Sequence, residues 1–383
     1  RDRSVSRGLG DVYKRQMLKY KKKSRKCKKG CEIMIELNTN KQGKGPTIKV
    51  IGVGGGGNNA INRILENGKP HENVQYVAVN TDEQVLTDSK AQEIVQIGTK
   101  LTGGYGAGAD PETGEAAARE SEDEITDTVT GCDMVILTAG MGGGTGTGAL
   151  PVIAEICRNK GILTVAVVTM PFSFEGESHT LVAENGMESL KKNVDTLLII
   201  PNDKLLDITD KPFYLEDAFQ MADQVLRDTI NGIIGIIFNT GMINLDFNDI
   251  RTTMLNKGIG HLGIGRVEAG GSVIDAVNAA IKSPLLDADI TGASNIMINS
   301  SGRINLNELN EAVTYIKEIA GANVKLIWGT VKDSSDDDSI VVTVIATGMP
   351  GKDAPMIDHK LNQKHTKSAD GFQIEIPPFL KIY

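Results

Sequence analysis

Ala139-Gly-Met-Gly-Gly-Gly-Thr-Gly-Thr-Gly148 is the stretch of this 383-residue sequence that decides the fold. It follows an apolar run, Met134–Thr138, that is typical of a buried strand, and it precedes a helical pattern that continues through Cys157. Glycines let the backbone approach a phosphate group closely, and the free N–H groups at a helix start stabilise its charge. Thr145 and Thr147 add hydroxyl donors. This second glycine loop, residues 139–148, therefore predicts a phosphate site at the end of a strand.

A first glycine loop lies upstream, at Gly52-Val-Gly-Gly-Gly-Gly57, between a strand pattern at Ile48–Val53 and a helix from about Asn58. It satisfies G-x-G-x-x-G, which alone is typical of dinucleotide sites, and Asp82 could then act as the ribose-binding acid. An NAD-dependent oxidoreductase therefore remains an alternative. Two glycine loops at one sheet edge instead predict a polyphosphate held from two sides. The sequence contains no G-x-x-x-x-G-K-[ST], which excludes a P-loop NTPase.

Short apolar runs alternate with amphipathic stretches from Thr47 onward, which predicts an α/β fold with a parallel, Rossmann-like sheet covered by helices on both faces. In such sheets ligands bind at the carboxyl ends of the strands, where both glycine loops fall. Apolar residues three and four apart over about 214–238 predict one long central helix connecting two domains. The patterns beyond it suggest a smaller α+β C-terminal domain. The remaining predicted strands are 74–80, 95–97, 163–169, 196–200, 295–298, 325–328 and 340–345, with a late helix over about 306–319.

Charge separates residues 1–33 from the rest of the chain. This segment holds 13 Lys or Arg against three acids and has no apolar core of a secretory signal, so we interpret it as a non-native or disordered basic leader. A membrane- or nucleic-acid-binding patch is the alternative. The other residues hold 28 of the 41 basic and 46 of the 49 acidic residues, a net charge of about −18, which argues against nucleic-acid binding. The sequence shows no apolar run of about 18 residues, so no membrane insertion is expected. The four cysteines lack zinc-site spacing, and a reduced, cytoplasmic compartment is expected.

Further motifs occur in a fixed order along the chain. They are GVGGGGNN at 52–59, Asn80-Thr-Asp82, Leu101-Thr-Gly-Gly-Tyr-Gly-Ala-Gly-Ala-Asp-Pro111, GGGTGTG at 142–148, Pro171-Phe-Ser-Phe-Glu-Gly176, Ile200-Pro-Asn-Asp-Lys204 and Asn244-Leu-Asp-Phe247. Together they resemble the FtsZ family of the tubulin/FtsZ superfamily, over about Met34 to Gly348. A plasmid-segregating, tubulin-like filament protein is the alternative within that superfamily.

The resemblance implies a site for GTP or GDP, with Mg²⁺ held through phosphates and water rather than by a protein metal centre. It assigns the α- and β-phosphates to Gly55, Gly56, Gly57, Asn58 and Asn59. It assigns the β- and γ-phosphates to the second glycine loop, at Gly142, Gly143, Gly144, Thr145, Gly146 and Thr147.

The same resemblance implies residues for the ribose and the base. Glu175 would bind the ribose hydroxyls, and Asn202 would contact the base or the sugar. Phe219 and Asp223 lie four residues apart on one face of the long helix, so Phe219 can stack on a purine while Asp223 accepts from the guanine N1–H and N2–H pair that adenine lacks. The plainer readings are core packing for Phe219 and an exposed loop acid for Glu175.

His179 departs from the family pattern, which usually has Arg at this position. A neutral imidazole would remove a fixed cation from the neighbourhood of the nucleotide. The departure predicts weaker nucleotide affinity or slower turnover.

Asn244-Leu-Asp246-Phe-Asn-Asp249 resembles the family's catalytic loop. Two carboxylates three residues apart can orient and polarise a water molecule, and the resemblance implies that they act on the nucleotide of the next subunit. A helix N-cap at Asp246 with a first-turn acid at Asp249 is compatible with this role.

The last residues turn apolar after a polar stretch. Ile374-Glu-Ile-Pro-Pro-Phe-Leu-Lys381 resembles the family's C-terminal peptide, which implies membrane-tether and division proteins as partners, besides other copies of the chain, at the division site. The predicted segments are the leader at 1–33, a GTP-binding domain at 34–211, the central helix at 212–239, a C-terminal domain at 240–350, a linker at 351–371 and a partner-binding peptide at 372–383.

Overall fold

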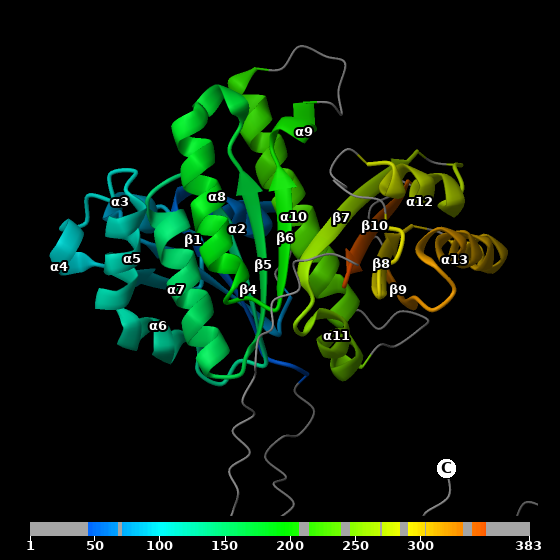
Figure 1. Cartoon of the computed structure of the whole chain (residues 1–383), viewed down its shortest axis with the longest axis horizontal. Helices are drawn as coiled ribbons and strands as arrows, with labels where there is room; N and C mark the ends of the chain where they lie inside the picture. Colours follow the sequence, from blue (N-terminus) through cyan, green and yellow to red (C-terminus); the bar gives the residue numbers. More distant parts are fainter. Residues whose placement is uncertain are drawn as a thin grey trace, which may run out of the picture. The chain divides into compact units, whose positions relative to one another are not determined.

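A single ten-stranded sheet, in the order β3-β2-β1-β4-β5-β6-β7-β10-β8-β9, organises the chain (Figure 1). The computed structural model describes residues 45–67, 71–206, 214–238, 246–268, 270–283, 290–302, 304–331 and 339–349. These residues belong to one compact unit that begins at Gly45. The expected leader, linker and C-terminal peptide, as well as Asn244, lie outside the described residues.

The first six strands are parallel and lie in the order β3-β2-β1-β4-β5-β6. The order reverses between β1 and β4, and such a switch point opens a crevice beyond the carboxyl ends of the two strands. The first glycine loop follows β1 and the second follows β4, so both lie at this crevice. The strands are β1 (Ile48–Val53), β2 (Val74–Asn80), β3 (Glu93–Gln96), β4 (Met134–Gly140), β5 (Leu163–Met170) and β6 (Thr196–Pro201).

Two apolar cores cover the two faces of this parallel part of the sheet. Helices α2 and α10 pack on one face, where Ile61 and Ile230 are fully buried. The second face is covered by the helices that include α5 and α7, where Leu150 and Ile153 are fully buried. Strands buried on both sides need continuous apolar runs, which β1 and β4 provide. The helices are α2 (Gly54–Asn67), α3 (Glu83–Thr87), α4 (Thr99–Thr102), α5 (Pro111–Glu120), α6 (Glu122–Val129), α7 (Thr145–Asn159), α8 (Glu177–Lys191) and α9 (Asp203–Leu206), with a 3₁₀ turn, η1 (Ser173–Glu175).

Helix α10 (Leu215–Phe238) is the expected long helix, and it also lies against the remaining strands of the sheet. Strand β7 pairs in parallel with β6, β10 pairs antiparallel with both β7 and β8, and β9 pairs in parallel with β8. A third apolar core, which includes Trp328, lies between these strands and helices α12 and α13. The elements are α11 (Phe247–Met254), β7 (Gly258–Val267), α12 (Val273–Ile281), β8 (Asn295–Ser301), α13 (Leu306–Ala320), β9 (Lys325–Val331) and β10 (Ile340–Thr347).

Strand β7 is an element that the sequence patterns missed, because its glycines are typical of a turn. Two of them are required by packing. A Cβ on Gly265 would lie 2.0 Å from the carbonyl oxygen of Ala276 in α12, and one on Gly260 would lie 2.8 Å from Leu198 in β6. The glycines of β7 therefore let a helix and a neighbouring strand approach its backbone closely.

Among the described residues, none of the helices combines the length and the apolar character that a membrane crossing requires.

Candidate nucleotide site

The two glycine loops bring the starts of two helices together. Helix α2 begins at Gly54 directly after β1, and α7 begins at Thr145 after β4. A Cβ on Gly54 would lie 2.9 Å from the backbone nitrogen of Gly146, so the two loops are in direct contact. Neither helix has an acidic residue in its first turn, and no side chain caps α7. Two helix starts that meet without carboxylates predict an anion site.

The glycines of the loops divide into two groups. A Cβ on Gly57 would lie 2.5 Å from the Thr138 carbonyl oxygen, and one on Gly144 would lie 2.8 Å from the backbone nitrogen of Asp110. These glycines are needed for the loops to close-pack. A Cβ on Gly55 or Gly143 would instead meet nothing within 4 Å. The open space beside these two glycines is where a phosphate can approach the backbone.

Side chains assigned to the phosphates are partly used to hold the loops. Asn58 is fully buried, and in the amide orientation that suits its neighbours it donates to the carbonyl oxygens of Gly52 and Gly54, both at 2.9 Å. The buried Thr147 hydroxyl accepts from the Gly142 N–H at 2.9 Å. The Asn58 amide and the Thr147 hydroxyl therefore hold loop backbone in place, since buried polar groups are positioned by their hydrogen-bond partners.

Other assigned residues remain accessible. Asn59 is exposed, and Gly56 and Thr145 are partly exposed. The Thr145 hydroxyl lies 2.7 Å from the Thr81 hydroxyl, at the end of β2. Thr81 lies within the Asn80-Thr-Asp82 motif, but its contact with the second loop, which is distant in sequence, is visible only in the fold.

A cluster of three phenylalanines lies at the carboxyl end of β5 and the start of α10. Phe172 and Phe174 stack with ring centroids 4.9 Å apart, and Phe219 meets Phe172 edge to face at 5.5 Å. Phe219 is 41% exposed, so core packing alone does not account for it. Its accessible ring can contact a purine while its edge stays fixed by Phe172.

Asp223 lies one turn after Phe219 and is held by a residue of α2. Its Oδ2 accepts a hydrogen bond from Arg63 Nε at 2.8 Å. Burial raises the pKa of Asp223, whereas the charge and hydrogen bond of Arg63 lower it. Burial of a carboxylate in this way is typical of functional sites. The sequence patterns did not single out Arg63, because its partner is 160 residues away.

Asn202 follows β6 and is buried, and its Oδ1 has no hydrogen-bond partner. Such an orphaned acceptor needs a donor, which a ribose hydroxyl or a base N–H can supply. The orphaned oxygen, the open glycines and the paired helix starts together fit a nucleoside polyphosphate.

Glu175 and His179 lie at the rim of this region. Glu175 Oε1 accepts from the Phe172 N–H at 2.8 Å, so in this structure it stabilises η1. The His179 backbone oxygen lies 3.1 Å from a Cβ position on Gly142, whose φ of +106° also requires glycine. The backbone of His179 therefore lies beside the second glycine loop, and Glu175 lies in the turn that precedes α8.

The acid needed for an NAD site is engaged elsewhere. Asp82 is the N-cap of α3, where Oδ1 accepts from the N–H groups of Gln84 at 2.9 Å and Val85 at 3.3 Å. This contact satisfies the helix start. Asp82 therefore has a structural role in this fold as the N-cap of α3.

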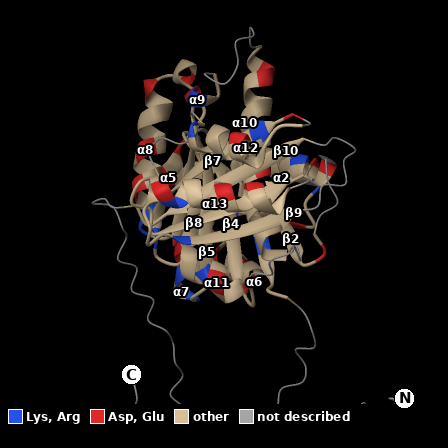
Figure 2. Cartoon of the chain, turned by 90° about the vertical axis from the view of Figure 1, so that its right-hand side faces the viewer, with Lys and Arg blue, Asp and Glu red and all other residues tan. Residues whose placement is uncertain are grey.

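The acids assigned to catalysis lie at the opposite end of the sheet. Asp246 is the N-cap residue of α11, and its side chain makes no capping hydrogen bond. Arg251 in this helix donates to the carbonyl oxygen of Gly161, which precedes β5, and Thr196, the first residue of β6, donates to the Met254 carbonyl. Helix α11 therefore lies at the amino ends of strands whose carboxyl ends lead to the nucleotide region. Figures 1 and 2 both show α11 far from α9 and the start of α10.

Asp249 is exposed and accepts from Lys325 Nζ at 3.2 Å. Asp246 is exposed as well, and both carboxylates can meet a molecule that approaches from outside. Within the described part of the chain, no group of three or more His, Cys, Asp or Glu side chains could hold a metal ion.

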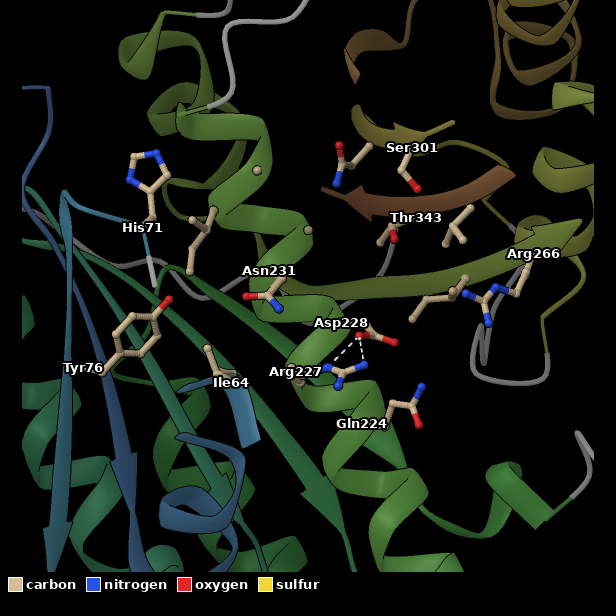
Figure 3. A pocket seen from close by; sticks show the side chains of 16 residues that line it. Ile64, His71, Tyr76, Gln224, Arg227, Asp228, Asn231, Arg266, Ser301 and Thr343 are labelled. Atoms are coloured by element: carbon tan, nitrogen blue, oxygen red, sulfur yellow. Dashed lines mark hydrogen bonds and ion pairs between the residues drawn. The ribbon is translucent and has the colours of Figure 1, made fainter. Parts of the chain in front are cut away.

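A separate cleft of about 500 Å³ lies between α10 and strands β7, β8 and β10 (Figure 3). Arg227 pairs with Asp228 inside it, and burial raises the pKa of Tyr76 to about 12. Figure 3 shows Ser301 and Thr343 on the side of the cleft that faces α10. No residue assigned to the nucleotide lines this cleft, so the glycine loops remain the candidate site.

These features define an α/β protein with two glycine loops that meet at the switch point of a parallel sheet, an arrangement typical of proteins that bind nucleotides. Residues 47–210 match the GTPase domain of the Tubulin/FtsZ family, and residues 258–350 match the C-terminal domain of the FtsZ family. The chain belongs to the tubulin/FtsZ family and is a tubulin-like GTPase.

Solved structures agree with this assignment. The chain is similar to the empty FtsZ dimer from M. jannaschii, with 39% identity, a TM-score of 0.76, and coverage of 88% of this chain and 92% of that chain. CetZ1 from Haloferax volcanii, a GDP-bound monomer, has 22% identity, a TM-score of 0.68 and coverage of 81% and 96%. CetZ2 from Haloferax volcanii, a GTPγS-bound protofilament, has 20% identity, a TM-score of 0.66 and coverage of 82% and 96%. The two CetZ proteins share the fold.

Proposed function

We propose that this chain polymerises head to tail and hydrolyses GTP at a site shared by two adjacent copies. One copy provides the glycine loops with Phe219 and Asp223, and the next copy provides Asp246 and Asp249. The single observation that carries the proposal is the separation of these two groups, at opposite ends of one parallel sheet. A rigid sheet keeps them apart within one copy, whereas stacking copies end to end brings them together.

Exposed apolar side chains at the nucleotide end support a contact there. Phe174 is 55% exposed, and Tyr214 and Leu215 at the start of α10 are 78% and 60% exposed. Leu206 in α9 adds a fourth at the same end. Grouped apolar side chains at a surface are typical of protein interfaces. The surface next to the nucleotide is therefore suited to bury against another copy.

The chemistry divides between the two halves. Helix starts and open glycines bind the polyphosphate and stabilise its charge, and Asp223 selects guanine through two N–H donors. The carboxylate of Asp246 orients a water molecule toward the γ-phosphate, and Asn244 and Asp249 are assigned supporting roles in the same step. Mg²⁺, bound mainly to phosphate oxygens and water, would supply positive charge at the phosphates.

The cellular role follows from the FtsZ match and the tail peptide. We infer a cytoplasmic filament of the cell-division ring, with residues 372–383 binding a membrane tether. We also propose a GTP-binding domain at 34–211, a central helix at 212–239 and a C-terminal domain at 240–350. FtsZ from M. jannaschii occurs as a dimer and CetZ2 as a protofilament, which supports self-association. Another tubulin-like filament function is the second candidate, and the match to the FtsZ C-terminal domain favours division.

The dependence of the GTPase rate on protein concentration tests this proposal. We expect the rate per molecule to rise about tenfold or more across a threshold, because mass action controls the fraction of chains assembled. Light scattering in the same samples should rise at the same concentration. A rate per molecule that stays constant down to concentrations without polymer would contradict a shared site.

A further inference from the structure

Arg63 and Asp223 form an ion pair between two helices that contact different ends of the proposed nucleotide. Arg63 belongs to α2, which begins at the first glycine loop, and Asp223 belongs to α10. Arg63 Nε donates to Asp223 Oδ2 at 2.8 Å, and the two side chains are 33% and 13% exposed. The pair is therefore shielded from solvent much more than the other ion pair of α2, Lys90 with Glu66, whose side chains are 53% and 44% exposed.

The geometry of this ion pair restricts how the Asp223 carboxylate can be oriented. A guanidinium is planar and presents its N–H donors in a fixed fork, so a hydrogen bond through Nε limits the orientation of the carboxylate plane. A carboxylate recognises guanine by accepting from N1–H and N2–H at the same time, and this requires its plane to be aligned with the base. A side chain that limits the orientation of this carboxylate therefore influences which base is bound.

We propose that Arg63 is a specificity-determining positioning residue, which keeps the Asp223 carboxylate oriented for guanine. The inference rests on the proposed function, because it assumes that Asp223 meets the base. Arg63 acts through Asp223 and is not assigned a contact with the nucleotide.

The charge balance at Asp223 supports this role. Burial raises the pKa of Asp223, and the two effects that lower it both come from Arg63. Without Arg63, burial is unopposed and the carboxyl group takes up a proton more readily. A protonated carboxyl group presents a donor where guanine also presents a donor, so it binds the base less well.

Nucleotide titrations with GTP and ITP test the inference, since inosine keeps N1–H but lacks the N2 amine. We expect the unmodified chain to bind GTP about tenfold or more tightly than ITP, as one hydrogen bond to a charged group contributes. Arg63→Met keeps the aliphatic stem and should lose most of this preference. Arg63→Lys keeps the positive charge but lacks the planar set of N–H donors, so it should keep part of the preference for GTP over ITP.

Lys90→Met is the matched control, because it removes the exposed ion pair with Glu66 of the same helix. It should leave the GTP-to-ITP ratio unchanged. The inference is overturned if Arg63→Met keeps the GTP-to-ITP affinity ratio of the unmodified chain. If only Arg63→Lys folds, the same result for that variant overturns it. Equal loss of affinity for both nucleotides would also overturn it, because that result indicates a purely structural role. Failure of the unmodified chain to bind GTP would instead contradict the proposed function itself.

Discussion

Replacing Asp246 with alanine is expected to leave GTP binding intact and to slow hydrolysis at least about a hundredfold, the lower end of what a positioned acid-base group contributes. The carboxylate lies at the amino ends of the strands, whereas the glycine loops lie at the carboxyl ends of β1 and β4, so the substitution does not touch the nucleotide of its own copy. The fold should also tolerate it, because the exposed side chain makes no capping hydrogen bond.

The measurement compares GTP affinity, polymer mass and turnover for Asp246→Ala and the unmodified chain. Glu318→Ala, which removes an exposed acid from α13, is the control and should behave as the unmodified chain. Normal turnover in polymers of Asp246→Ala would remove Asp246 from the reaction. Loss of GTP binding would show that the two ends of the sheet are not independent.

The second large effect concerns two neighbouring glycines of the first glycine loop. Gly57→Ala places a methyl group 2.5 Å from the Thr138 carbonyl oxygen and 2.9 Å from the carbonyl carbon of Gly52. Backbone must then move on both sides, and we expect a loss of about 1–3 kcal/mol in the free energy of unfolding together with loss of GTP binding. Denaturant unfolding without nucleotide measures the first effect.

Gly55→Ala is the matched variant, because its methyl group meets nothing within 4 Å. We expect its free energy of unfolding to change little, while GTP affinity falls about tenfold or more, since the methyl group occupies the space assigned to a phosphate. Titration with a fluorescent GTP analogue measures the affinity. If Gly55→Ala bound GTP as tightly as the unmodified chain, the phosphate would not lie beside this glycine.

Local patterns predicted the elements that hold the nucleotide region. Buried apolar runs gave β1 and β4, and the spacing of apolar residues predicted α10 to within about one residue of its observed start at Leu215. Strand β7 was missed because its glycines are required by tertiary packing. Gly265 packs against a helix that follows in sequence, and Gly260 packs against a strand that precedes it. Packing overrode the local signal there.

The sequence predicted where the candidate site residues lie along the chain, whereas the structure adds the contacts of their side chains. Asn58 directly follows the first glycine loop and Thr147 lies in the second, and their side chains form hydrogen bonds with loop backbone. Arg63 pairs with a residue 160 positions away, so no spacing pattern identifies it, and the contact of Thr81 with Thr145 likewise becomes visible only in the fold. The separation of Asp246 from the loops depends on strand direction and order, which only the assembled sheet provides.

Mixing two inactive variants tests the shared site most directly. At a GTP concentration that saturates Asp246→Ala but lies below the weakened affinity of Gly55→Ala, the first variant should bind GTP but lack the catalytic carboxylate, whereas the second should be mostly free of GTP but keep Asp246. Mixed junctions are of two kinds: in one, the GTP-loaded end of Asp246→Ala meets the intact acid end of Gly55→Ala and completes a site, and in the other both contributions are defective. A shared site predicts that each variant alone is inactive and that the mixture hydrolyses GTP. A mixture that forms joint polymers and remains inactive at every ratio would contradict it.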